Sequence, residues 1–156
     1  MENIQIDYQI VSKEELSDLE QALVKKAIDA LAGAHAPYSN FKVGSAVQME
    51  DGTVVSGNNQ ENAAYPSGLC AERVALFAAK SQTKQPIKAI TIVAKNQNKE
   101  AADAFSCGNC RQVMMEYANE QNDPIKIIMG DHEGKFIVLD DVRKLLPFSF
   151  YSKSLK

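Results

Sequence analysis

The three cysteines of this 156-residue chain constrain its fold more than any other feature, because all of them stand where predicted helices begin. Cys70 lies in "SGLCAERVALFAAK", with Glu72 two residues later, and "FSCGNCRQVMMEY" holds Cys107 and Cys110, separated by two residues. If Ser67 is the N-cap of the first helix, Cys70 lies in the first turn, where unpaired N–H groups and the helix dipole favour a thiolate. Two converging helix starts would therefore bring three thiolates around one cation.

Three convergent thiolates predict a zinc site with one open position. Zinc accepts thiolates at about 2.3 Å, and a closed structural site needs a fourth protein ligand. The two histidines are poor candidates for it, because His35 lies far from either cysteine segment and His132 lies in a predicted turn. An open position normally holds water, whose pKa zinc lowers to about 7. Glu72 is placed to move protons to and from that water.

Three thiolates on a divalent ion leave a net negative charge at the site, and this charge weakens the Lewis acidity of the ion. Two arginines are placed to offset it, because Arg73 follows Glu72 directly and Arg111 follows Cys110 directly. We expect Arg73 to donate a hydrogen bond to a ligand sulfur. The positive ends of the two helix dipoles also offset this negative charge.

Simpler readings of these residues exist. A C-x-x-C pair alone is also typical of dithiol redox sites, the three thiols could be unrelated buried residues, and a helical glutamate is usually solvated. The order C-x-E followed by C-x-x-C favours another reading. It resembles the zinc-deaminase signature, in which His or Cys, a non-ligand Glu and P-C-x-x-C follow one another.

The periodicity of the chain predicts a three-layer α/β/α sandwich. Capping-box residues Ser12 and Glu15 introduce an amphipathic helix that ends near Gly33. Helices then alternate with buried strands, which implies a sheet of about five strands covered on both faces. The expected elements are a helix over 12–31, a hairpin over 41–57 that turns at 51–52, a helix from 67, a strand over 87–94, a helix from 107, strands on either side of the turn at 131–134, and a short helix over 140–146.

Composition and charge narrow the class of protein. The net charge is −3, without a basic patch, which argues against binding to nucleic acid and favours a small ligand. The first ten residues lack the pattern of a signal peptide, and no apolar run reaches the roughly 18 residues of a membrane span. We therefore expect a cytoplasmic protein in which residues 1–156 form one catalytic domain, with no membrane partner.

Beyond the cysteines, four ordered motifs resemble the small, homotetrameric, zinc-dependent cytidine deaminases. They are "APYSNFKVGSAV", "NNQENAAYPSGLCAERVALF", "CGNCRQVMMEY" and "LLPFSF". The resemblance implies the fold of that family with a mixed sheet, one Zn²⁺ per subunit and a homotetramer. It implies hydrolysis of cytidine and deoxycytidine to uridine and deoxyuridine in pyrimidine salvage, with release of ammonia.

The resemblance also implies a role for each residue of the site. Cys70, Cys107 and Cys110 correspond to the zinc ligands and Glu72 to the proton shuttle. The substrate-binding residues it implies are Phe41 against the pyrimidine, Asn59 and Glu61 at the ribose hydroxyls, Ala71 through its backbone near the base amide, Tyr65 near the subunit boundary, and Phe150 in a neighbouring subunit's pocket. Each of the side chains also has an ordinary structural reading, as core, turn or surface.

The sequence departs from the family pattern in three places. Ser106 stands where proline generally precedes the first cysteine of the pair, Gln60 replaces an aliphatic residue, and the tail after Phe150 lacks a Gly-Pro continuation. Two alternatives remain at this point. One is a deaminase of a cytosine nucleoside analogue, such as a blasticidin-type antibiotic, and the other is a non-catalytic zinc or redox module.

Overall fold

The computed structural model describes residues 1–96, 98 and 101–155 of the chain. Its strands and α-helices are, in chain order, β1 (Gln9–Ser12), α1 (Asp18–Ala30), β2 (Lys42–Met49), β3 (Val54–Asn58), α2 (Ala71–Gln82), β4 (Ile87–Lys95), β5 (Ala101–Ala102), α3 (Gly108–Gln121), β6 (Lys126–Asp131) and β7 (Lys135–Leu139). Short 3₁₀-helices span Lys13–Glu15, Leu31–Gly33, Tyr65–Ser67, Val142–Leu145 and Ser152–Leu155. The predicted final helix over 140–146 is thus a 3₁₀ turn.

The strands form one mixed sheet, as predicted. Its order is β1-β7-β6-β4-β2-β3, with β5 paired to β4. Strands β4 and β6 run parallel, and the other described pairs are antiparallel. The five expected strands are β2, β3, β4, β6 and β7, whereas β1 and β5 add to the prediction. With four and two residues respectively, these two strands are too short to give a clear alternating pattern.

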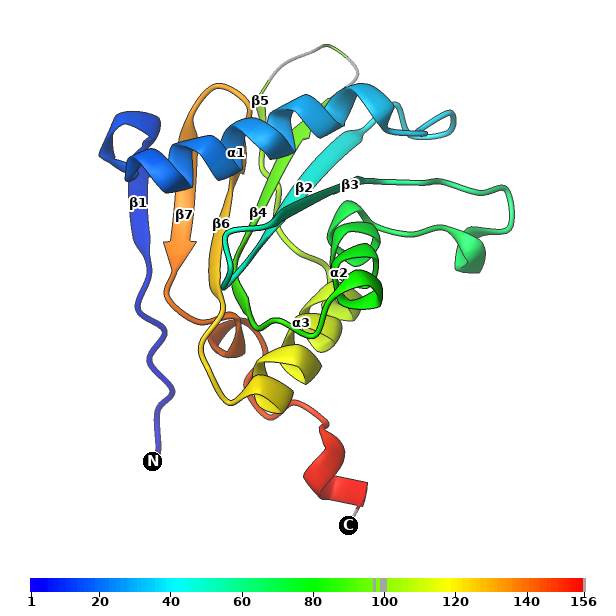
Figure 1. Ribbon diagram of the computed structural model, residues 1–156. Coiled ribbons are helices and arrows are strands. Elements are labelled where there is room, and N and C mark those ends of the chain that lie inside the picture. The colour runs from blue at the N-terminus through cyan, green and yellow to red at the C-terminus, as the bar shows by residue number, and fades with distance from the viewer. Residues whose placement is uncertain (97, 99–100, 156) are drawn as a thin grey trace.

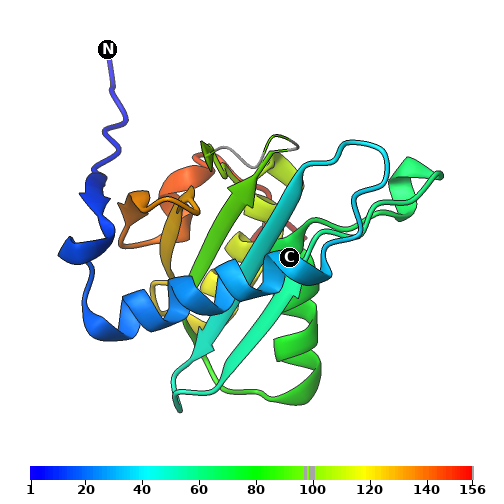
Figure 2. The same cartoon turned by 90° about the horizontal axis from the view of Figure 1, so that it is seen from above.

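Helices cover both faces of the sheet, which confirms the predicted three layers. Helix α1 crosses one face, and α2 and α3 lie together on the opposite face (Figures 1 and 2). Each interface holds its own apolar cluster. On the α1 side it includes Leu23, Val24, Ala27 and Phe136, and on the other side it centres on Leu76, Ile90, Ile92, Met114 and Ile127.

The first helix begins later than the sequence predicted. The Ser12–Glu15 capping box starts only a 3₁₀ turn, and a second box, formed by Ser17 and Glu20, starts α1. Leu19 is 68% exposed although it follows the apolar period. The reason is geometric, because Leu19 lies roughly a quarter-turn from the centre of the buried face. Glu20 lies nearer that centre and its Oε1 accepts from Lys126 Nζ at 2.7 Å.

A close helix–strand contact sets the position of α2 and therefore of the first cysteine. A Cβ at Gly57 of β3 would lie 2.5 Å from the backbone nitrogen of Ala75 and 2.8 Å from the carbonyl oxygen of Ala71. Only glycine allows this approach, since real Cβ atoms do not come so near to backbone atoms. The first two turns of α2 are thereby held directly on β3.

Among the described residues, no helix has the length and apolar character needed to cross a bilayer.

Candidate metal centre and active-site cavity

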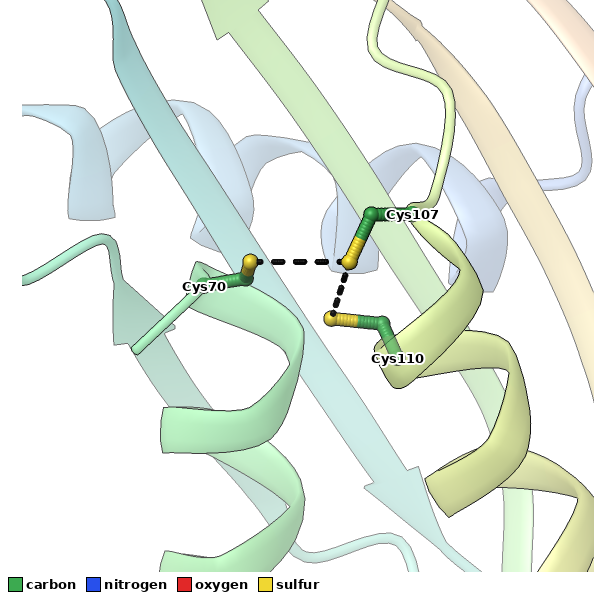
Figure 3. Close-up of side chains that lie close together, drawn as sticks. All are labelled: Cys70, Cys107 and Cys110. Atoms are coloured by element: carbon green, nitrogen blue, oxygen red, sulfur yellow. Dashed lines mark hydrogen bonds between the residues drawn. The ribbon is translucent and has the colours of Figure 1, made fainter. Parts of the chain in front are cut away.

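The three cysteines converge at the adjoining starts of α2 and α3. Figure 3 shows their side chains pointing toward one another, one from α2 and two from α3. Cys70 Sγ lies 3.8 Å from Cys107 Sγ, and Cys107 Sγ lies 3.6 Å from Cys110 Sγ. All three sulfurs lie within 4.8 Å of one another, and all three thiols are free. The cluster therefore has three thiol donors facing one point.

The spacing of the sulfurs fits zinc. Ligands at about 2.3 Å in a tetrahedron stand about 3.8 Å apart, which matches the two measured sulfur–sulfur distances. The group of donors that the structure assembles consists of these three cysteines. Among the described residues no fourth donor joins this group, so a tetrahedral ion held by the three sulfurs would have a position open to a further ligand.

Helix α2 starts three residues later than a Ser67 cap would place it. The prediction that Ser67 caps α2 was wrong, since Cys70 is itself the N-cap residue, and Cys107 holds the same place at α3. Ser67 instead ends a 3₁₀ turn over Tyr65–Ser67. Neither N-cap sulfur accepts a capping hydrogen bond from a backbone N–H of its own helix. Both sulfurs therefore remain available at the positive end of a helix dipole.

The electrostatics of the cluster favour an ionised sulfur. A hydrogen bond from Cys110, aided by Arg73, lowers the pKa of Cys70 to about 5 against the cost of burial. Cys110 is the donor in this hydrogen bond to Cys70, and the bond therefore raises the pKa of Cys110. Without a cation, one sulfur of this pair thus ionises while the other keeps its proton. A divalent ion that takes both must release that proton.

Glu72 lies beside the cluster and is 3% exposed. Burial raises the pKa of its carboxyl, with a further contribution from Cys70, while its own backbone N–H opposes the shift. A carboxyl with a raised pKa can both accept and return a proton near neutral pH.

The two arginines adopt different positions. Arg73 Nη2 donates to Cys70 Sγ at 3.7 Å, in the arrangement expected from the sequence. Arg111 instead donates from Nε to the carbonyl oxygen of Ser106 at 2.8 Å and from Nη1 to that of Leu145 at 3.1 Å. Arg111 therefore fixes the backbone that enters α3, and Arg73 is the cation in contact with the cluster.

A cavity of about 650 Å³ opens beside the sulfurs. Of the residues singled out from the sequence, it is lined by Phe41, Asn59, Glu61, Tyr65, Cys70, Ala71, Glu72, Arg73 and Cys107. Cys110 is fully buried and is not among the lining residues. Phe150 lies outside the lining and is 61% exposed, and its carbonyl oxygen accepts from Gln112 Nε2 at 2.7 Å. The structure thus brings every predicted site residue to the cavity lining except Phe150 and the buried Cys110.

Asn59 holds the aromatic side of the cavity in place. Its Oδ1 accepts from the backbone nitrogen of Val43 at 2.9 Å, and its Nδ2 donates to the carbonyl oxygen of Phe41 at 2.9 Å. One amide hydrogen and one lone pair of Asn59 remain for a ligand. The residue therefore positions Phe41 and keeps capacity to bind a hydroxyl.

Glu61 is held by a loop that the sequence analysis treated only as part of a motif. Its Oε2 accepts from the backbone nitrogens of Tyr38 at 3.0 Å and Ser39 at 3.3 Å, and its Oε1 accepts from the Ser39 hydroxyl. The Ser39 bond holds the pKa of Glu61 below its usual range. The Tyr38 ring in turn meets Tyr65 edge-on at 6.3 Å. Sequence reasoning missed Tyr38 and Ser39, whose only signal was the "PYS" of the quoted motif.

Comparison with known proteins agrees with this geometry. A family model described as "Cytidine and deoxycytidylate deaminase zinc-binding region" matches residues 17–122. A cytidine deaminase of Halalkalibacterium halodurans is 40% identical over 135 residues, which cover 86% of this chain and 96% of that protein. One of Sporosarcina psychrophila is 38% identical over 137 residues, covering 86% and 93% respectively.

Solved structures extend the similarity to the fold. The crystal structure of cytidine deaminase from Burkholderia pseudomallei matches with a TM-score of 0.73 at 38% identity, over 83% of this chain and 97% of that one. The crystal structure of cytidine deaminase from Mycobacterium tuberculosis matches with a TM-score of 0.65 at 33% identity, over 86% and 98%.

Proposed function

The chain belongs to the cytidine and deoxycytidylate deaminase family, and on that premise we infer that it catalyses zinc-dependent hydrolytic deamination of cytidine and deoxycytidine. The products are uridine or deoxyuridine and ammonia. The observation that carries this inference is the three-sulfur cluster beside a buried glutamate at the wall of a cavity. Purified protein loaded with zinc is expected to convert cytidine to uridine with one ammonia per turnover, and absence of both products would refute the inference.

Zinc fits the three-sulfur site, where Cys70, Cys107 and Cys110 would hold it, and when bound it supplies a Lewis acid that makes water nucleophilic near neutral pH. In this proposal Glu72 carries out the proton transfers. Its carboxylate accepts a proton from the water that attacks C4 of the pyrimidine and delivers that proton to N3. It then accepts the remaining proton of the hydroxyl at C4, as the carbonyl forms, and delivers it to the amine, which leaves as ammonia. Its burial beside the sulfurs keeps this exchange away from bulk water.

The remaining cavity residues orient the nucleoside in this proposal. The ring of Phe41 lies along the pyrimidine, and Asn59 and Glu61 bind the sugar hydroxyls. The backbone of Ala71, which lies between Cys70 and Glu72, meets the base amide. Their common place in the cavity lining supports these roles.

Replacing Glu61 with glutamine is expected to raise the KM for cytidine roughly tenfold, because a hydrogen bond to a charged group is worth more than one to a neutral amide. We expect kcat to change little, since Glu61 lies away from the reacting atoms in this arrangement. Steady-state kinetics on cytidine test both values. Glu120→Gln on the exposed face of α3 is the matched control. An unchanged KM in Glu61→Gln would remove Glu61 from the sugar site.

Cytidine monophosphate is expected to be a poor substrate. The charged residues that line the cavity are Glu61, Glu72 and Asp103 against Arg73, and Arg73 already contacts Cys70. A phosphate on the sugar would add negative charge to a cavity whose described lining holds three carboxylates and no free cation. We expect kcat/KM for the nucleotide at least tenfold below that for the nucleoside at equal ionic strength. Comparable values would show that the sugar end of the cavity accepts phosphate.

We further propose that residues 1–156 act as one catalytic domain of a cytoplasmic homotetramer, as the family resemblance implies. Exposed aromatic side chains support the association of subunits, because Tyr65, Phe105, Phe148 and Phe150 are between 56% and 95% exposed. Phe150 stands outside its own cavity, which suits a residue that reaches a neighbouring one. The molar mass in solution tests the proposal.

The alternative functions are not favoured. A closed structural zinc site or a redox dithiol gives no reason for a buried Glu72 at the wall of a cavity. The relatives and solved neighbours described above are cytidine deaminases rather than deaminases of an antibiotic.

A further inference from the structure

The hydroxyl of Ser106 is buried and lacks a partner. Ser106 is 2% exposed, and its Oγ has no hydrogen bond within the described part of the chain. A buried hydroxyl without a partner costs free energy, so one that persists in a folded protein needs a reason. This one stands directly before Cys107, at the entrance to α3.

The backbone around Ser106 fixes where its side chain points. Burial alternates from Ala104, which is buried, through Phe105, which is exposed, to Ser106, which is buried, as in an extended segment. Arg111 Nε holds the carbonyl oxygen of Ser106 at 2.8 Å. The hydroxyl is therefore directed inward by an anchored backbone.

The group that Ser106 meets inside is the Glu72 carboxyl. Both residues adjoin the sulfur cluster, since Glu72 follows Cys70 by two positions and Ser106 precedes Cys107, whose sulfur lies 3.8 Å from that of Cys70. The Ser106 hydroxyl lies near enough to this carboxyl to lower its pKa slightly, although the two groups form no complete hydrogen bond in this structure. Glu72 and Ser106 are two of the four buried polar residues among those described.

We propose that Ser106 is a positioning residue for the deamination, whose Oγ–H donates a hydrogen bond to the Glu72 carboxylate and holds it toward the attacking water and the base. The proposal rests on the function proposed above. A charge-assisted bond in a site of low dielectric constant is strong and directional. It limits rotation of Glu72 while leaving its second oxygen free to move protons. Zinc binding does not depend on it.

The test compares two substitutions at position 106 with a matched control. Ser106→Ala removes the hydroxyl and Ser106→Thr keeps it. Thr91→Val removes the other buried, unpartnered hydroxyl, which lies on β4 with Ala89 and Val93 on the face toward α1. Measurements are kcat and KM for cytidine, zinc per subunit, melting temperature, the Kd for uridine, and a crystal structure of each protein.

In Ser106→Ala we expect kcat to fall roughly tenfold, the effect of losing a hydrogen bond to a charged group. We expect KM, zinc content, melting temperature and uridine affinity to stay unchanged, and Ser106→Thr to recover most of the lost rate. The wild-type crystal should show Oγ bonded to a Glu72 oxygen, and the alanine variant should show that carboxyl in more than one conformer.

Three outcomes would overturn the proposal: an unchanged kcat in Ser106→Ala, an equal loss in Thr91→Val, or a single unshifted Glu72 conformer in the alanine crystal. A rate lost together with zinc or with the folded state, and not recovered by threonine, would show a structural role instead. A wild-type protein that forms no uridine would defeat the proposed function, whereas the crystal comparison would still decide whether Ser106 holds Glu72.

Discussion

Glu72→Gln is expected to lower kcat for cytidine by roughly 10²–10⁴-fold, the range that general acid–base catalysis supplies. Glutamine keeps the size and hydrogen-bonding shape of the side chain but cannot accept and return a proton. Because the residue is 3% exposed, removing its charge adds no desolvation cost, so we expect unchanged or higher stability and full zinc content. The measurement is single-turnover and steady-state kinetics on protein of confirmed metal content.

Glu116→Gln is the matched control, because it makes the same change on the exposed side of α3. Its kcat should equal that of the wild type. A Glu72→Gln protein that folds, retains zinc and deaminates at the native rate would falsify the assignment of Glu72. A variant that loses its zinc would instead show that the carboxylate supports the metal site.

The metal centre was the most predictable part of the molecule. An odd number of cysteines disfavours a disulfide framework, so three thiols at two helix starts left few readings, and the structure brings their sulfurs within 4.8 Å. Their assembly depends on local signals, since a helix start fixes the direction of an N-cap side chain. The sequence also predicted the doubly covered sheet, because buried strands such as β4 carry apolar residues on both faces. That the sheet is mixed was implied by the family resemblance.

Capping residues predicted the wrong helix start where the chain offers two candidates close together. Ser12 and Ser17 both begin capping boxes, and only the second one starts a helix of full length. Ser67 is a good capping residue, yet the chain uses it in a 3₁₀ turn and Cys70 takes the cap position. Tertiary contacts decide such cases, here the approach of α2 to Gly57 of β3. No pattern of neighbouring residues contains that information.

The nucleoside end of the cavity was the least predictable part. The motif carrying Asn59 and Glu61 indicated polar contacts, but it gave no sign that Asn59 bonds to the backbone on both sides of β2's first residue. Nor did it show that Glu61 is held by Tyr38 and Ser39, which lie more than twenty residues earlier. Such contacts between loops depend on the final path of the chain.

These observations share one physical basis. The sheet and its two apolar clusters hold the starts of α2 and α3 side by side, and every charged group of the chemistry is attached to those starts. Burial raises the pKa of Glu72. The neighbouring thiol of Cys110 and the guanidinium of Arg73 lower the pKa of Cys70. The pKa values of the acid and the metal ligand are thus shifted in opposite directions although the two residues lie two positions apart.

Cys110→Ala is expected to abolish stoichiometric zinc binding and to reduce deamination to the limit of detection. Cys110 is fully buried and supplies the third donor, and two remaining sulfurs cannot complete an open three-ligand site. The fold should survive, because the apolar clusters on both faces of the sheet do not depend on the ion. Elemental analysis, circular dichroism and the cytidine assay measure the three expectations.

The chain has only three cysteines, so the matched control is wild-type protein freed of zinc by a chelator. Binding stabilises a folded protein by RT ln(1 + [L]/Kd), which amounts to about 2.7 kcal/mol at a hundredfold excess over Kd. Added zinc should therefore raise the melting temperature of the chelated wild type and restore its activity, but change neither in Cys110→Ala. If the variant kept one zinc per subunit and native turnover, another group would have to be the third ligand, and the open-site account of this chemistry would be wrong.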